Sequence, residues 1–133
     1  MSCLPHILAI ALHSQGGFNT AVPGLGLFCR ADSVIAGAGA YANSEKAVER
    51  KVSQYAFGGW QPFKLGDLRA GAMVGLVNGY SFNSGRTIPM AAAVLSWPLS
   101  TALRPLDAAH ITLIPPVRGV TPAVAQLSFT LRF

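Results

Sequence analysis

Polar and apolar side chains alternate along the last part of the chain. Residues 126–133 read Gln-Leu-Ser-Phe-Thr-Leu-Arg-Phe, and consecutive side chains of a β-strand point to opposite faces. The segment therefore predicts a strand with one apolar and one polar face. Such a strand turns its apolar face to the core of a soluble domain, or to lipid when it closes an outer-membrane β-barrel.

Seven further segments with strand character precede this one, separated by the turn-forming residues Gly, Pro, Asn, Asp and Ser. The connections are short, and residues 43–50 have room for one helical turn. The sequence predicts a single all-β domain over residues 1–133, an eight-stranded antiparallel up-and-down β-barrel that closes without exposed edges. The predicted strands are residues 6–13, 22–30, 33–42, 51–61, 66–79, 87–98, 109–116 and 122–133.

Alternation within the predicted strands also assigns side chains to faces. In the first strand, Leu8, Ile10 and Leu12 are expected on one face and His13 on the other. Glycines that share a face leave space inside a small barrel, which is filled by larger neighbours or forms a narrow ligand cavity. The glycines in question are Gly37, Gly39, Gly71 and Gly75.

Composition favours a membrane β-barrel. Charged residues make up 11% of the chain, less than half of the usual quarter. Hydrophobic residues reach 51%, yet no apolar run approaches the roughly 18 residues of a spanning helix. A water-soluble barrel or sandwich is the alternative, and which strand face is wet stays open.

The net charge of +5 suits anionic headgroups or nucleic acid, but no basic cluster is interleaved with aromatic residues as in a nucleic-acid module. The first residues lack the basic segment and the long apolar segment of a signal peptide, so none is expected. Aromatic side chains near strand ends fit either an interfacial belt or ordinary packing. They are Trp60, Phe63, Tyr80 and Trp97.

The two cysteines leave two alternatives open. If the first two strands form a hairpin, Cys3 and Cys29 lie near the same end of the barrel. A register that pairs them allows a disulfide in an oxidising compartment. Two buried free thiols are the other alternative.

Candidate chemistry gathers at one rim. The first strand ends at His13 and Ser14, and the third ends at Asn43 and Ser44. Because odd-numbered strands of a meander run in one direction, both pairs lie at the rim opposite the termini. A histidine base, a serine hydroxyl and hydrogen-bond donors are the groups that acyl transfer uses. The alternative is that these are turn residues and a structural histidine.

The sequence contains no motif for metal binding or for nucleotide binding. The three histidines and two cysteines lack the spacing of metal ligands, and there is neither a P-loop nor a dinucleotide fingerprint. No metal and no cofactor are expected.

The order of these landmarks resembles the outer-membrane lipid A palmitoyltransferase family. That family is an eight-stranded barrel that moves a palmitoyl chain from a phospholipid to lipid A. The landmarks run along nearly the whole chain, and each is individually common. They are His13, the Pro-Gly-Leu-Gly-Leu strand 23–27, the pair 43–44, the aromatic-Pro passage 59–65, the Gly-rich strand 69–79, and residues 88–90, 98–100, 110–115 and 126–133.

The resemblance implies a bacterial outer-membrane location, an acyl-chain cavity in the lumen, and phospholipid or lipid A as partners. It also implies a catalytic His, acidic residue and Ser at the outer rim, which are His13, Asn43 and Ser44 here. Asn43 departs from the family because an amide hydrogen-bonds but carries no charge. The exchange suggests a site that binds an acyl chain rather than one that transfers it.

Two further functions compete with this one. One is a non-enzymatic structural or interaction barrel of a virion or an envelope. The other is a soluble, lipocalin-like carrier of a hydrophobic ligand. The acyl donor and the oligomeric state are not predicted.

Overall fold

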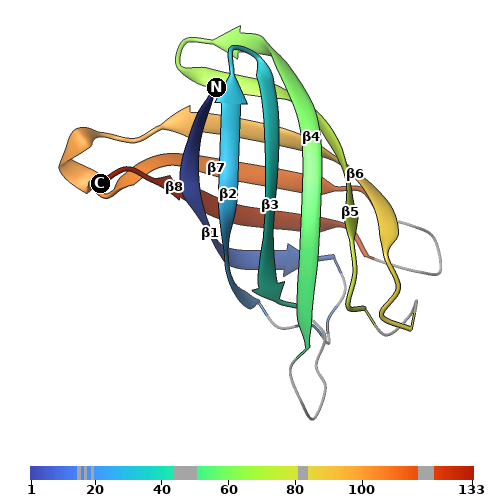
Figure 1. Cartoon of the computed structure of the whole chain (residues 1–133). Helices are drawn as coiled ribbons and strands as arrows, with labels where there is room; N and C mark the ends of the chain where they lie inside the picture. Colours follow the sequence, from blue (N-terminus) through green and yellow to red (C-terminus); the bar gives the residue numbers. More distant parts are fainter. Residues whose placement is uncertain (15, 17, 19, 44–50, 81–83, 117–121) are drawn as a thin grey trace.

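The chain folds into a closed barrel of eight antiparallel strands in which neighbours along the sequence are neighbours in the sheet, and β1 also pairs with β8 (Figure 1). The computed structural model describes residues 1–14, 16, 18, 20–43, 51–80, 84–116 and 122–133. Within these ranges, no helix has the length and apolar character needed to cross a membrane. The strands are β1 Ser2–His13, β2 Ala21–Ala31, β3 Val34–Ala42, β4 Val52–Leu65, β5 Leu68–Val77, β6 Ile88–Pro98, β7 Leu106–Ile114 and β8 Val124–Leu131, with a 3₁₀ turn η2 at Thr101–Leu103.

The eight predicted strands and their up-and-down order are confirmed. The predicted connection at residues 62–65 is wrong, because β4 continues to Leu65 and the turn lies at Gly66 and Asp67. The ladder between β4 and β5 shifts register between Trp60 and Phe63. Pro62 lies in this bulge, where a residue without an N–H interrupts no ladder hydrogen bond. The helical turn expected within 43–50 falls almost entirely outside the described residues.

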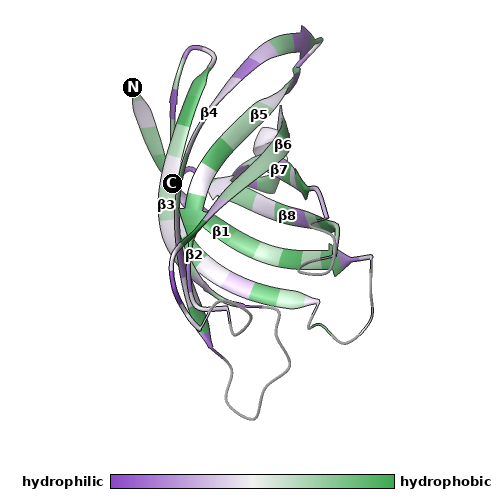
Figure 2. Ribbon diagram, turned by 90° about the vertical axis from the view of Figure 1, so that its right-hand side faces the viewer, coloured by the Kyte–Doolittle hydropathy of each residue, from purple (hydrophilic) through white to green (hydrophobic). Residues whose placement is uncertain are grey.

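Most outward-pointing strand positions are apolar, whereas the buried, inward-pointing positions include both polar and apolar side chains. Figure 2 shows how hydrophilic and hydrophobic residues follow one another along the strands. On β2, Leu25 and Leu27 are 66% and 54% exposed. On β8, Ser128 and Thr130 are buried between the apolar positions of the alternating segment. The apolar face of the closing segment therefore looks outward.

A β-bulge in β1 changes the predicted faces of that strand. The register with both neighbouring strands shifts between Leu8 and Ile10. In the ladder with β8, Ala9 is an extra residue of β1, whereas in the ladder with β2 the extra residue lies on β2. Leu8 is buried, whereas Ile10 is exposed, so the two do not share a face as predicted. His13 lies two residues beyond the buried Ala11 and faces inward with it.

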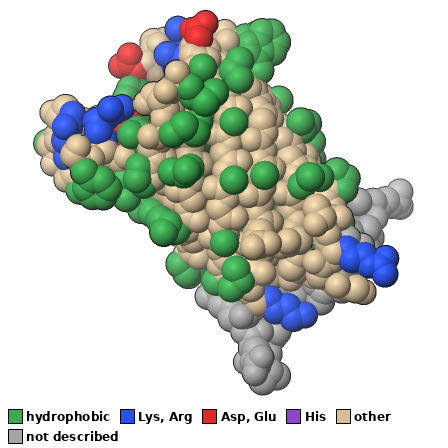
Figure 3. All heavy atoms as spheres, in the orientation of Figure 1, with side chains coloured by type: hydrophobic (Ala, Val, Ile, Leu, Met, Phe, Trp, Pro, Cys, Tyr) green, Lys and Arg blue, Asp and Glu red, His purple; other side chains and the backbone are tan. Residues whose placement is uncertain are grey.

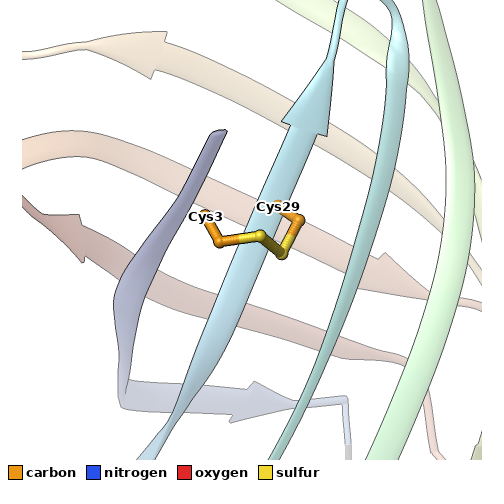
Figure 4. The surroundings of a disulfide bond; sticks show 2 residues. All are labelled: Cys3 and Cys29. Carbon is orange, nitrogen blue, oxygen red and sulfur yellow. A yellow bond between two sulfur atoms is a disulfide. The ribbon is translucent and has the colours of Figure 1, made fainter. Parts of the chain in front are cut away.

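Cys3 and Cys29 form a disulfide, as Figure 4 shows. The two residues are direct partners in the β1–β2 ladder. Cys29 lies two residues beyond the exposed Leu27 and therefore on the same face of β2, which places the bond on the outer surface near the termini. Of the two alternatives left open by the sequence, the structure has the disulfide, a bond typical of oxidising compartments.

Large side chains fill the middle of the lumen. Phe28, Ile35 and Val94 form its buried core, against which Phe57 packs. The inward glycines of β3 make room for the rings of β4, because a Cβ at Gly37 would lie 2.6 Å from the ring of Phe57. The space predicted from these glycines is thus occupied by neighbours at this level of the barrel.

Candidate functional site

His13 lies at the rim opposite the termini, on the inner face of β1. Its backbone pairs with Val124 of β8, and its imidazole stacks on Phe18 with ring centroids 4.5 Å apart. Ser14, which follows His13, forms two hydrogen bonds with Ala123. Its backbone N–H donates to the carbonyl of Ala123 at 2.9 Å, and its Oγ accepts from the N–H of Ala123 at 2.9 Å. The start of β8 therefore holds the end of β1 in place.

Asn43 lies at the same rim but is completely buried. Its Nδ2 donates to the carbonyl oxygen of Gly79 at 2.9 Å and to Oγ of Ser53 at 3.3 Å. Its backbone N–H donates to the carbonyl of Lys51. These bonds connect the ends of β3, β4 and β5, so Asn43 joins three strands at this rim.

Of the three predicted catalytic residues, the structure describes two, His13 and Asn43. The meander brings His13 and Asn43 to one rim, as expected from the strand directions. The recorded bonds of Asn43 run to β4 and to the residues after β5, while the ring of His13 contacts Phe18. Ser44 lies outside the described residues.

An apolar pocket of about 800 Å³ adjoins His13. Alanine, valine, leucine, isoleucine and methionine side chains dominate its lining, which comes from β1, β5, β6, β7 and β8. The lining residues include Met73 and Ala92, which are buried on the inner face, and Val74, which is exposed on the outer face. Residues of both faces of the barrel wall therefore border the pocket.

The pocket lies where two strands of the barrel separate. β6 pairs with β5 from Ile88 onward, but its ladder with β7 begins only at Ala93 opposite Leu113. Strand β7 ends at Ile114 because Pro115 and Pro116 follow, and proline has no N–H for a ladder. Among the described residues, the first part of β6 is therefore paired on one side only, which opens the wall beside the pocket.

A polar network that no sequence motif predicted crosses the lumen nearer the termini. Gln61 Nε2 donates to Oγ of Ser96 at 3.0 Å, and this Oγ lies 2.8 Å from Nδ1 of His110. His110 Nε2 lies 3.4 Å from Oγ1 of Thr130. Ser96 and His110 have the residue types of a nucleophile and its base, but both are 3% exposed, so the network packs the lumen and no substrate reaches it.

Two histidines meet in this packing. The His6 and His110 rings lie edge to face at 5.8 Å, and His110 stacks on Phe28 at 4.4 Å. Nδ1 of His6 lies 3.2 Å from the hydroxyl of Tyr55. Strand alternation was the available signal, since it places His6 on the face of Leu8 and His110 on that of Thr112.

The outer surface separates charge from apolar area. In Figure 3, Lys, Arg, Asp and Glu side chains gather towards the two ends of the visible face, with hydrophobic side chains between them. Near the termini, Trp60 and Phe63 are strongly exposed on the outside. Tyr80 is different, because its hydroxyl hydrogen-bonds to that of Tyr41 on the inner face of β3.

Metal chemistry finds no ligand set in the part of the chain that the structure describes, where no three His, Cys, Asp or Glu side chains cluster. Comparison with known proteins adds no assignment. No protein-family model matches the chain, and no curated protein matches it either.

Proposed function

We propose that the chain is an outer-membrane-type β-barrel that binds an acyl chain in the apolar pocket beside His13. The observation that carries this proposal is the pocket itself, about 800 Å³ of apolar space beside the place where the ladder between β6 and β7 has not yet begun. Ligand pockets of small molecules typically have 300–1,000 Å³. An acyl chain is the apolar ligand that a membrane supplies to such an opening.

The outer surface supports a membrane location for the barrel. Its exposed apolar residues include Leu25, Leu27, Val74 and Leu76, each more than half exposed. Burying such side chains stabilises each by about 1.5–3 kcal/mol, so a surface of this kind favours lipid around it. The strands have 8–14 residues, close to the roughly 9–11 residues of a tilted membrane strand. The outer disulfide fits the oxidising side of a bacterial inner membrane.

Detergent dependence tests the location. We expect the folded protein to need micelles or lipid, and to carry phospholipid or lipid A acyl chains after purification. Circular dichroism and tryptophan fluorescence report the fold, and mass spectrometry identifies the bound lipid. A folded, monodisperse protein in detergent-free buffer contradicts the proposal: with bound lipid it is the soluble carrier, and without lipid it is the structural barrel.

Transfer of the chain from phospholipid to lipid A is the second candidate function. It rests on the resemblance and on the position of His13 at the pocket, where a neutral imidazole can accept a proton from an attacking hydroxyl. Asn43 has its amide bound to Gly79 and Ser53, where a carboxylate would orient the histidine in the family. Binding therefore has more support than transfer.

His13→Ala separates the two functions. If transfer occurs, the variant is expected to lose about 10²–10⁴-fold of its rate, the usual contribution of a general base, while acyl binding persists. The assay follows a deuterated acyl chain from phospholipid to lipid A by mass spectrometry. Ser100→Ala, at the other end of the barrel, is the control. Full transfer by folded His13→Ala rules out this role, and no transfer by the native chain leaves binding alone.

A further inference from the structure

We propose that the barrel binds a phosphate group at its other mouth, between Arg30 and Arg69. This site lies at the end where the termini and the short turns lie, away from the acyl pocket. It does not depend on the proposed function, because the two arginines are present whether the barrel lies in a membrane or in water.

Two non-adjacent strands bring these arginines together. Arg30 follows the buried Phe28 by two positions on β2, and Arg69 lies on the face of β5 that carries Met73, so both belong to inner faces. Nη1 of Arg69 donates to the backbone carbonyl of Asp32 at 3.1 Å, two residues beyond Arg30. The two guanidinium groups therefore share one mouth of the barrel.

No carboxylate balances this pair among the described residues. The one ion pair recorded there joins Arg132 to Asp107 at 2.8 Å. Two like charges in a partly buried mouth repel each other more strongly than in water. The mouth carries five cationic and three anionic described residues: Arg30, Lys64, Arg69, Arg104 and Arg132, and Asp32, Asp67 and Asp107. This excess of positive charge favours an anionic ligand.

The guanidinium of Arg30 is held in place before any ligand arrives. Its Nη2 donates to Oε1 of Gln61 at 2.6 Å, and Gln61 Nε2 is itself fixed by Ser96 and by the carbonyl of Val94. Its Cζ lies 5.8 Å from the ring centroid of Phe28. The remaining Nη1 is buried and has no acceptor among the described residues. A buried N–H donor without an acceptor is destabilising, and a bound anion that reaches it supplies one.

A phosphate group fits this arrangement better than a carboxylate does. Its several oxygens can accept from the guanidinium groups of Arg30 and Arg69 at the same time, and its charge matches two guanidinium groups. The phosphate of a lipid headgroup and a free phosphate offer the same chemistry. The structure assigns the recognised group, and the experiment distinguishes its source.

Phosphate binding is measured on the folded barrel in uncharged detergent. We expect inorganic phosphate to raise the melting temperature in a saturable manner at constant ionic strength, whereas chloride does not. Arg69→Gln is expected to weaken phosphate binding at least tenfold, and Arg104→Gln at the same end is the matched control. Arg30→Gln is a second variant, but it also removes the bond to Gln61 and can impair folding, so Arg69→Gln decides.

Competition by phosphatidic acid in the micelles identifies the source. If the lipid displaces inorganic phosphate from the native protein but not from Arg69→Gln, the group recognised is a lipid headgroup. If it fails to displace it, free phosphate is the ligand. The site is refuted if the native protein shows no saturable response to phosphate or to phosphatidic acid, or if Arg69→Gln responds as Arg104→Gln does. Acyl binding is measured separately, so either proposal can fail alone.

Discussion

Replacement of Gly71 by alanine is expected to prevent normal closure of the sheet between β4 and β5. A Cβ at this position would lie 1.9 Å from the carbonyl oxygen of Trp60 and 2.6 Å from Cα of Gln61. Both are backbone atoms of the β4 bulge, so no side-chain rotation relieves the clash. Overpacking in cores typically destabilises by about 1–3 kcal/mol, and a backbone clash of this size is expected to reach or exceed that range.

Gly58→Ala is the matched control for this prediction. Gly58 lies on β4, and no atom comes within 4 Å of a Cβ built there. Urea unfolding of both variants in the same detergent, followed by tryptophan fluorescence, gives the difference in unfolding free energy. Equal stabilities for Gly71→Ala and Gly58→Ala would show that the bulge does not approach β5 as described.

Blocking the pocket is expected to lower the affinity for an acyl chain at least tenfold, equivalent to about 1.4 kcal/mol. Ala92→Phe puts a ring into the pocket from the inner face of β6, where the alanine is 6% exposed. Ala125→Phe narrows the same pocket from β8 and keeps the test valid if the first variant folds poorly. Binding of a fluorescent fatty acid to the folded barrel is the measurement.

Ala38→Phe controls for the added ring, because Ala38 lies on the exposed outer side of β3 and does not line the pocket. This variant is expected to bind the fatty acid with the affinity of the native chain. If Ala92→Phe and Ala125→Phe both fold and bind the fatty acid with native affinity, the acyl chain does not occupy the pocket. The pocket then no longer supports the proposed function.

Local pattern was sufficient to predict the architecture but not the details that shape the site. Alternation depends on neighbours in sequence, so it predicted eight strands but not which face of each strand points inward; on β5, Met73 is buried and Val74 is exposed. A bulge changes the direction of the side chains along a strand, but no pattern of residue types marks its position. For that reason the predicted faces of Leu8 and Ile10 and the predicted connection at residues 62–65 were wrong.

The interior of the candidate site depends on distant strands. The hydrogen bonds among Gln61, Ser96 and His110 join β4, β6 and β7, which are far apart in sequence. A polar strand face has the same sequence pattern whether it faces water or the lumen, so the pattern alone did not predict these bonds. The pocket depends on the unequal lengths of two ladders. Pro115 and Pro116 were the visible reason for that inequality, although only the register of β6 reveals the gap they leave.

The bulge in β1 decouples the faces of the rim from the number of residues in the strand. Beyond Ala9, every side chain of the strand is turned by one position relative to strict alternation. Without the bulge but with Ala9 in place, alternation from the inward Leu8 would point Leu12 into the barrel and His13 towards its surroundings. Deletion of Ala9 would instead remove the bulge and leave Leu12 outward and His13 inward, so the strand carries one residue more than its faces require.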